Sequence, residues 1–390
     1  MARLRLVTLT VLLALAACAP AAHAARGMEV AIQDDATFLY RALPRGVTYD
    51  DALAYAKRLH VTWIRVNVAW NHVLPASQVN SRRVPRSPSY QWGTWDALVQ
   101  QAHDAGLHVE LVVTGYAPAF ATGDHRVGVN RPNARLYGQF VTAVAKHFYP
   151  LGVTRYSVWN EPNFVGFLGP KAQQPALYRS LYQAAYAALR RYAPRAQVLF
   201  GETAPQVDRW RFTAPLAFLR AVTCVDAHYR HRNRHCPKLV ADGYATHPYN
   251  YNHSPTYRGL TKDDVTIGTL SGLGYALDRL RSLGALRTPK RGSLPVYLTE
   301  FGYLAKPTRW ERAWSESQRR RWVPQAFGIA QRNFRVRQMV EYQLFAPPCP
   351  SNWCFFDTAL VTRTRKELPT FRALEAWTAS AARRRLIATR

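Results

Sequence analysis

Two glutamates stand where apolar, strand-like segments end, a position from which a carboxylate can act on a bound molecule. Residues 156–163 read YSVWNEPN, so Glu161 closes an apolar run and Pro162 follows it. Residues 296–302 read VYLTEFG, so Glu300 closes a second run. Pro162 disfavours a helical conformation for Glu161 and cannot donate to a strand ladder. The two segments predict a pair of carboxylates presented at strand ends.

Paired carboxylates can perform acid–base and nucleophilic chemistry on a single bond. Cleavage of a glycosidic bond with retention requires a carboxylic acid that protonates the leaving oxygen. It also requires a carboxylate, about 5 to 5.5 Å away, that attacks the anomeric carbon. Two nearby carboxylates do not ionise easily together, so one keeps a proton near neutral pH. Once the nucleophile is esterified its charge disappears, and the acid can then serve as the base for water.

The rest of the chain predicts the scaffold that would hold these groups. Short β-branched apolar runs alternate with amphipathic helical stretches, which is typical of parallel strands covered by helices. Strands are expected at residues 29–33, 62–68, 108–113, 154–159, 197–201, 239–246, 295–300 and 338–345. Helices are expected at residues 48–59, 95–105, 132–147, 175–192, 272–283, 316–333 and 368–382.

Eight such units predict an α/β fold, a single-domain (β/α)8 TIM barrel with long loops at the C-terminal face of the strands. An open doubly wound sheet is the alternative, but no glycine-rich phosphate loop follows the first strand. In a barrel, strands four and seven occupy opposed sectors, so Glu161 and Glu300 can face each other across the mouth.

The alternation of side chains along a strand affects where Asn160, Glu161 and Glu300 can point. Asn160 and Glu161 would point to opposite faces of a regular strand, so a bulge or a strand end must redirect one of them. Val296 and Leu298 share a face with Glu300. If these two apolar side chains fill the barrel interior, Glu300 emerges at its upper rim.

The two motifs together resemble clan A of the glycoside hydrolases, closest to families 39 and 5. The resemblance covers nearly the whole chain after residue 24. It implies that Glu161 is the acid/base and Glu300 the nucleophile. It also implies that Asn160 binds the sugar 2-hydroxyl. The reaction expected is hydrolysis of β-linked glycans by double displacement, with no metal and no organic cofactor. The alternatives are a catalytically inactive glycan-binding barrel and a transglycosylase on the same scaffold.

Weaker matches add candidate binding residues. Residues 64–67 (IRVN) resemble the strand-two segment whose Arg lies beside the nucleophile, which implies that Arg65 holds Glu300 ionised. Residues 247–249 (HPY) resemble the clan's His-x-Tyr, in which Tyr249 can bond the nucleophile. Arg65 and His247 are also compatible with purely structural roles.

Aromatic residues in the loops after strands are candidates for stacking on sugar rings, although such residues also serve loop packing. We expect substrate contacts from Trp70, Tyr116 and Trp353. The clan commonly places a Trp at the end of strand eight, whereas residues 342–345 read YQLF here. This departure puts the geometry of the sugar site in doubt more than the type of reaction.

Residues 1–24 have the pattern of a bacterial export signal, with early arginines, an apolar run and a small-x-small end. Residues 15–18 (LAAC) also resemble a lipobox, so Cys18 is either lipidated as a membrane anchor or discarded with the signal. We expect residues 25–390 to form the catalytic barrel, secreted or attached to the cell envelope, as a monomer. No later segment predicts a transmembrane span.

Four further cysteines in an oxidising compartment predict two disulfides. Sequence proximity favours Cys224 with Cys236 and Cys349 with Cys354, although three pairings are possible. The histidines of residues 228–236 give that segment a metal-like appearance. A disulfide explains Cys236 better, and the interspersed arginines repel a cation. No metal site is therefore predicted.

The formal net charge is +28, from 52 Lys and Arg against 24 Asp and Glu. Such a charge favours anionic partners, such as an acidic polysaccharide or a cell-surface polymer. The alternative is a bias to arginine spread over solvated helix faces. The arginines are scattered and no aromatic-interleaved motif accompanies them, so nucleic acid is not an expected partner.

Overall fold

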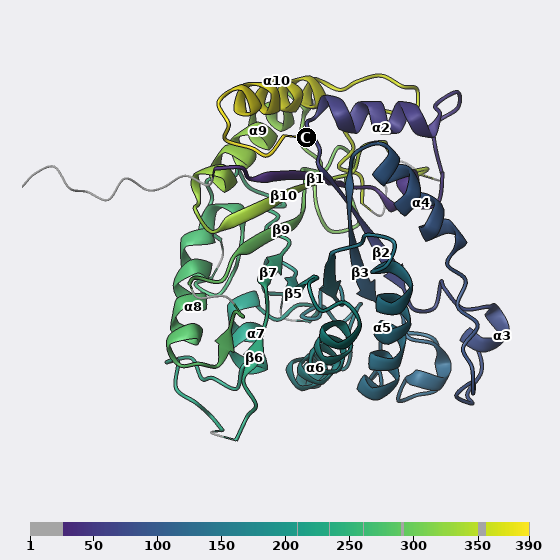
Figure 1. Cartoon of the computed structure of the whole chain (residues 1–390). Coiled ribbons are helices and arrows are strands. Elements are labelled where there is room, and N and C mark those ends of the chain that lie inside the picture. The colour runs from purple at the N-terminus through teal and green to yellow at the C-terminus, as the bar shows by residue number, and fades with distance from the viewer. Residues whose placement is uncertain are drawn as a thin grey trace, which may run out of the picture.

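The computed structural model describes residues 26–208, 210–233, 235–259, 261–289, 292–349 and 356–389. Eight parallel strands form a closed barrel in the order β1-β10-β9-β7-β5-β4-β3-β2. They are β1 (Glu29–Gln33), β2 (Trp63–Ala69), β3 (His108–Thr114), β4 (Arg155–Val158), β5 (Gln197–Thr203), β7 (Gly243–Thr246), β9 (Val296–Phe301) and β10 (Val336–Tyr342). Figure 1 shows helices surrounding these strands. The expected (β/α)8 barrel is confirmed.

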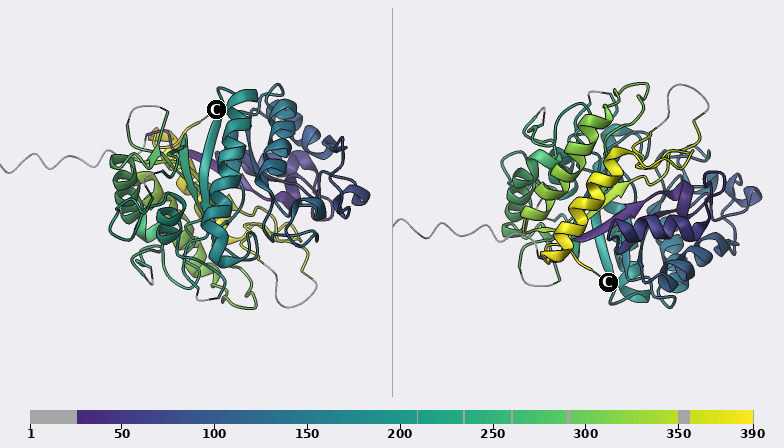
Figure 2. Two further views of the ribbon diagram at one scale, coloured as in Figure 1. Left: turned by 90° about the horizontal axis from the view of Figure 1, so that it is seen from below. Right: turned by 90° about the horizontal axis from the view of Figure 1, so that it is seen from above.

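The outer layer consists of α2 (Tyr49–Arg58), α4 (Gly93–Asp104), α5 (Ala134–Phe148), α6 (Gln174–Tyr192), α7 (Pro215–Val222), α8 (Leu270–Ser282), α9 (Glu316–Arg332) and α10 (Pro369–Arg383). Short helices α1 (Asp35–Phe38) and α3 (Ala76–Val79) lie in the loops after β1 and β2. Local signals set several helix starts: α2 and α9 begin with capping boxes, and α6, α7 and α10 carry Pro in the first turn. Helices α9 and α10 pack side by side (Figure 2).

The main apolar core lies between the strands and the helices. Inside the barrel the apolar groups are few: Ala31, Trp63 and Val340 form one small cluster, and Leu199, Ala245 and Tyr297 form another. Barrel interiors are usually filled by layers of Val, Ile and Leu. Buried polar and charged side chains take much of that space here, which indicates that the upper interior serves a site rather than packing alone.

The sixth expected strand, residues 239–246, is not continuous. Its first part, β6 (Leu239–Val240), pairs with β8 (Leu286–Arg287) in a separate two-stranded sheet, and only β7 joins the barrel. Between the two parts, the Asp242 carboxylate accepts the N–H of Val198 at 2.8 Å, and the Asp242 N–H donates back to the Val198 carbonyl. This side-chain bond to β5 marks the point where the chain enters the barrel.

The expected facing of strand seven was wrong. Val296 and Leu298 belong to the core that the helices share, whereas Tyr297 packs inside the barrel with Leu199. With regular alternation this facing would turn Glu300 outward.

An irregularity in β9 returns Glu300 to the barrel mouth. Leu298 pairs with Met339 of β10, and Phe301 pairs with Glu341. Three steps along β9 therefore match two steps along β10, so β9 contains one extra residue in this stretch. An extra residue of this kind breaks the alternation and redirects a side chain.

Cys224 and Cys236 are joined by a disulfide, with their Cα atoms 6.3 Å apart, as predicted. Cys354 and Trp353 lie outside the described residues, as do the leader and Cys18. The pairing of Cys349 with Cys354 therefore stays a prediction. Among the described helices, none combines the length and apolar character needed to cross a membrane.

Candidate active site

A cavity of about 380 Å³ opens at the C-terminal ends of the barrel strands. Polar side chains from strand ends and from the loops after them line it: Gln33, Asp35, Asn67, His72, Thr114, Asn160, Glu161, Arg211, Glu300 and Glu311. The cavity therefore contains both glutamates that the sequence singled out, together with Asn160.

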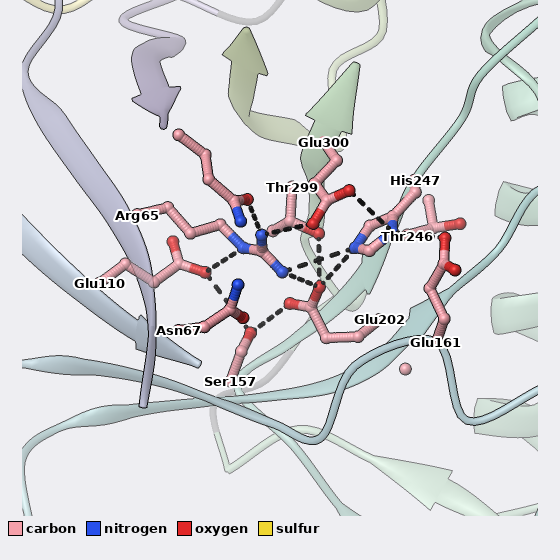
Figure 3. Close-up of polar contacts among 12 residues, drawn as sticks. Arg65, Asn67, Glu110, Ser157, Glu161, Glu202, Thr246, His247, Thr299 and Glu300 are labelled. Carbon is pink, nitrogen blue, oxygen red and sulfur yellow. Dashed lines mark hydrogen bonds and ion pairs between the residues drawn. The ribbon is translucent and has the colours of Figure 1, made fainter. Parts of the chain in front are cut away.

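Glu161 and Glu300 approach the same atom. The Nδ1 atom of His247 lies 3.0 Å from Oε1 of Glu161 and 3.5 Å from Oε2 of Glu300 (Figure 3). These two oxygens are therefore at most 6.5 Å apart, a separation at which two carboxylates can act on one glycosidic bond. Both carboxylates are partly exposed, at 12% and 13% of the side chain, whereas the ring of His247 is fully buried.

The chain turns sharply at the end of β4 to present Asn160 and Glu161 together. The φ angles of Trp159 and Glu161 are 67° and 38°, in the left-handed region that residues other than glycine rarely adopt. The N–H of Glu161 donates to the carbonyl of Glu202 at 2.9 Å, which ties this turn to β5. The departure from strand alternation that the sequence required is present at this turn.

Glu300 has a hydrogen-bond donor at each oxygen. Nη1 of Arg65 lies 2.9 Å from Oε1, and the Tyr249 hydroxyl donates to Oε2 at 3.2 Å. Burial raises the pKa of Glu300 above its ordinary value, while the positive charges of His247 and Arg65 oppose this effect. Arg65 and Tyr249 thus contact the carboxylate that the sequence resemblance assigned to them.

A third carboxylate, Glu202 at the end of β5, lies beneath the pair and was not singled out from the sequence. Its Oε2 atom is 2.7 Å from Nη2 of Arg65, 2.8 Å from Nε2 of His247 and 2.9 Å from Oγ1 of Thr299. Ser157 also donates a hydrogen bond to it. Burial acts to raise the pKa of Glu202, but Arg65 and His247 outweigh burial and lower this pKa to about 2.

The charges around His247 favour its protonated form. Burial alone would lower the pKa of this imidazole, but Glu300, Glu161 and Glu202 raise it to about 10. Deeper in the barrel, burial raises the pKa of Glu110 to about 7 against the opposing charges of nearby arginines. The site is therefore a compact group of alternating charges.

A second polar cluster lines the cavity at the ends of β1 and β2. The Asp35 carboxylate accepts the backbone N–H of Asn67 at 2.8 Å, its Nδ2 at 2.9 Å, and Nε2 of Gln33 at 3.0 Å. The sequence motifs did not point to this cluster. The signal was available, because Asp35 follows a strand as closely as Glu161 does, and Glu202 directly follows the strand predicted at residues 197–201.

Aromatic rings cover much of the remaining cavity wall: Tyr40, Phe164, Phe167, Phe212, Tyr249, Tyr251, Trp310, Tyr342 and Phe356. The Phe164 and Phe212 rings stack at 4.3 Å between centroids. Trp310 is 58% exposed, with the guanidinium of Arg211 4.8 Å from its ring centroid. Tyr342 ends β10, the strand where the resemblance would have placed a Trp.

Of the three aromatic residues expected to stack on sugar rings, Trp70 and Tyr116 do not line the cavity, and Trp353 lies outside the described residues. Trp70 is 1% exposed and stacks on Phe140 in the core, so its ring offers no free face to a sugar. Tyr116 is exposed but lies outside the cavity wall. Loop position indicates that a ring lies near the barrel mouth, but it does not say whether the ring turns toward the cavity or the core.

Metal ligands do not cluster in the described part of the chain. Within it, no group of three or more His, Cys, Asp or Glu side chains could hold a metal ion. In the histidine-rich segment 228–236, the disulfide occupies the sulfur of Cys236.

No protein-family profile and no curated protein sequence matches this chain. Solved structures do match. A family 39 glycoside hydrolase from the gut symbiont Bacteroides cellulosilyticus WH2 is 17% identical with a TM-score of 0.62, over 91% of this chain and 64% of that one. A family 39 β-xylosidase from Caulobacter crescentus is 16% identical with a TM-score of 0.57, over 91% and 73% of the two chains.

An exo-β-1,4-mannosidase from Opitutaceae bacterium strain TAV5 is 14% identical with a TM-score of 0.58, over 93% of this chain and 61% of that one. The present chain thus spans just under two thirds of the first of these three structures. At such low identity the likeness concerns the fold. The expected likeness in fold to family 39 glycoside hydrolases is therefore confirmed for the barrel.

Proposed function

We propose that this protein is a retaining glycoside hydrolase that cleaves β-linked glycosides, with Glu161 as acid/base and Glu300 as nucleophile. The observation that carries the proposal is the contact of both carboxylates with one nitrogen of His247. Retaining enzymes hold their two carboxyl groups about 5 to 5.5 Å apart, and inverting enzymes about 6.5 to 9.5 Å apart. The shared nitrogen favours the shorter separation.

The contacts of Glu300 suit a nucleophile. Arg65 and Tyr249 fix both of its oxygens, so the carboxylate is oriented before substrate arrives. In the first step Glu300 forms a bond to the anomeric carbon while Glu161 gives its proton to the departing oxygen. In the second step Glu161 takes a proton from water, which attacks the same carbon and releases Glu300.

The other polar groups of the cavity suit sugar hydroxyls. The Oδ1 atom of Asn160 is buried and has no hydrogen-bond partner within the described residues. Leaving such an atom unpaired costs about 1 to 3 kcal/mol, so a hydroxyl that donates to it would bind favourably. The Asp35 cluster and the aromatic rings add acceptors and apolar faces, the two kinds of group that a sugar ring requires.

We also propose that the protein is exported. The leader pattern supports this proposal, and so does the Cys224–Cys236 disulfide, a bond typical of oxidising compartments. The mass of the mature N-terminus separates the two processing routes. A lipid-modified Cys18 indicates an anchored protein, and an end after Ala24 indicates a secreted one.

Stereochemistry tests the catalytic proposal directly. Purified protein would be incubated with aryl β-glycosides of xylose, mannose and glucose, and proton NMR would identify the anomer released first. We expect the β-anomer, and an α-anomer would contradict the retaining mechanism. Longer glycosides instead of free sugar would indicate transglycosylation. Glycan binding without turnover on a broad panel of glycans would indicate an inactive barrel.

A further inference from the structure

Glu202 does not line the cavity, yet its contacts lead to both proposed catalytic groups. It is fully buried, and the same oxygen, Oε2, contacts Arg65, His247 and Thr299. Arg65 in turn contacts Glu300, with 2.9 Å between Nη1 and Oε1, and His247 contacts Glu161, with 3.0 Å between Nδ1 and Oε1. A single carboxylate thus contacts both the Arg65–Glu300 pair and the His247–Glu161 pair, as Figure 3 shows.

The chain is distorted in order to turn Glu202 inward. Between Gly201 and Thr203 the register of β5 against β7 shifts, so this stretch is irregular. The φ angles of Gly201 and Glu202 are 121° and 50°, both outside the usual region for an L-residue. Backbone strain of this kind persists only where the surrounding structure enforces it, and it occurs preferentially at functional sites.

The hydrogen-bond geometry accommodates a doubly protonated His247. Its Nδ1 faces an oxygen of Glu161 and its Nε2 faces an oxygen of Glu202. An ionised carboxylate only accepts hydrogen bonds, so both ring nitrogens must carry a proton when both glutamates are ionised. Neutral imidazole has a single N–H and satisfies both contacts only if Glu161 is protonated and donates to Nδ1, whereas the imidazolium leaves the proton of Glu161 free for the departing oxygen.

We propose that Glu202 is a positioning residue: it holds His247 as an imidazolium and Arg65 in a fixed orientation, and through them it sets the placement of Glu161 and Glu300. The catalytic consequence rests on the proposed hydrolase function, whereas the effect on His247 does not. Removing the charge of Glu202 leaves two buried cations with one carboxylate fewer between them, so His247 releases its proton more easily and Arg65 loses an anchor.

Charged or titratable groups from several elements interact electrostatically with Glu202. They are Arg65 from β2, Glu110 from β3, Tyr178 from α6, Tyr244 from β7, His247 after β7, and Glu300 from β9. The two cations are in direct contact with Glu202, and Ser157 bridges it to Glu110. The direct contacts therefore dominate, and of the two cations His247 is the one that can lose its proton, because an arginine stays protonated.

The test is a pH titration of His247, monitored by NMR of protein labelled with ¹⁵N-histidine. The His247 signals are assigned by their absence from the spectrum of a His247→Asn variant. In the wild type we expect the imidazolium signal to persist far above pH 6.5, the ordinary His pKa. In Glu202→Gln the midpoint should fall by at least about one pH unit. In Glu202→Asp, which keeps the charge on a shorter side chain, most of the shift should be reversed.

Glu341→Gln is the matched control. Glu341 is another buried barrel glutamate, and neither of its carboxylate oxygens has a hydrogen-bond partner in the described part of the chain. It lies on β10 next to Val340, which faces the interior, so its side chain points toward the helices. This variant should leave the His247 titration and the kinetics unchanged.

Kinetics supply the second readout. Because Glu202 does not touch the cavity, Glu202→Gln should leave KM within about threefold and lower kcat about a hundredfold, the effect of a misplaced catalytic group. A His247 that titrates near pH 6.5 in the wild type, or at the same pH in Glu202→Gln, would overturn the proposal. The titration of His247 in the wild type tests the proposal even if the Glu202→Gln variant does not fold. Absence of hydrolysis would count against the proposed function and leave the titration result intact.

Discussion

Arg65 and Glu300 form a largely buried ion pair across the mouth of the barrel, with 2.9 Å between Nη1 and Oε1, although β1 and β10 lie between their strands. The guanidinium has no exposed surface. Buried ion pairs contribute little net stability compared with apolar packing of similar volume, because both charges lose their hydration. The pair is therefore better explained by the chemistry of the cavity than by folding.

Replacing Glu300 with Ala should lower kcat/KM by more than about a thousandfold on every substrate, because the carboxylate that forms the glycosyl ester is then missing. The measurement is steady-state hydrolysis of an aryl β-glycoside. Glu375→Ala on α10, which removes a carboxylate paired with Arg58 on the outer surface, is the control and should keep full activity. Activity of Glu300→Ala within tenfold of wild type would exclude its role as nucleophile.

Replacing Glu161 with Ala should have an effect that depends on the leaving group. A dinitrophenyl group departs without a proton, so its release should be much less affected than release of a poor leaving group. Added azide should raise turnover and yield a β-glycosyl azide, because azide needs no general base. Equal losses with both leaving groups, together with no azide product, would remove Glu161 as the acid/base.

The pKa of His247, raised to about 10, makes part of the folding stability depend on pH. A raised pKa stabilises the folded state fully below the unfolded pKa of about 6.5, and this contribution is lost as pH rises through the folded value. The Tm difference between wild type and His247→Asn should therefore shrink by roughly half or more between pH 6.5 and 10. A difference that stays constant would contradict the charged state of His247.

Replacing Gly201 with Ala should destabilise the fold and displace Glu202. The new Cβ would lie 2.5 Å from the carbonyl oxygen of Ala245, and the φ of +121° is strained for any side chain. We expect a loss of about 1 to 3 kcal/mol or more in the free energy of unfolding, measured with urea, together with a lower kcat. Gly272→Ala is the control: it lies in α8 with open space around it and should stabilise by up to about 1 kcal/mol. Equal stability of the two variants would show that the β5 irregularity is not constrained.

The sequence determined the eight barrel strands and the placement of Glu161 and Glu300 at one end of them. Apolar runs and strand-end residues are local signals, and all strands of a parallel barrel end on the same face. The first expected strand, residues 29–33, has the bounds of β1 (Glu29–Gln33). The two catalytic candidates were found because each stands directly at a strand end, and the same signal was overlooked at Asp35 and Glu202.

Which side chains face the interior depends on the assembled barrel and could not be predicted from the sequence. Periodicity predicts alternating facing within one strand, but an extra residue in β9 turns Glu300 to the cavity, and an irregularity in β5 turns Glu202 inward. Both features are defined by the register between neighbouring strands, which the pattern of one strand does not contain. The placement of His247 between its carboxylates has the same origin, because it depends on three strands whose spacing is set when the barrel closes.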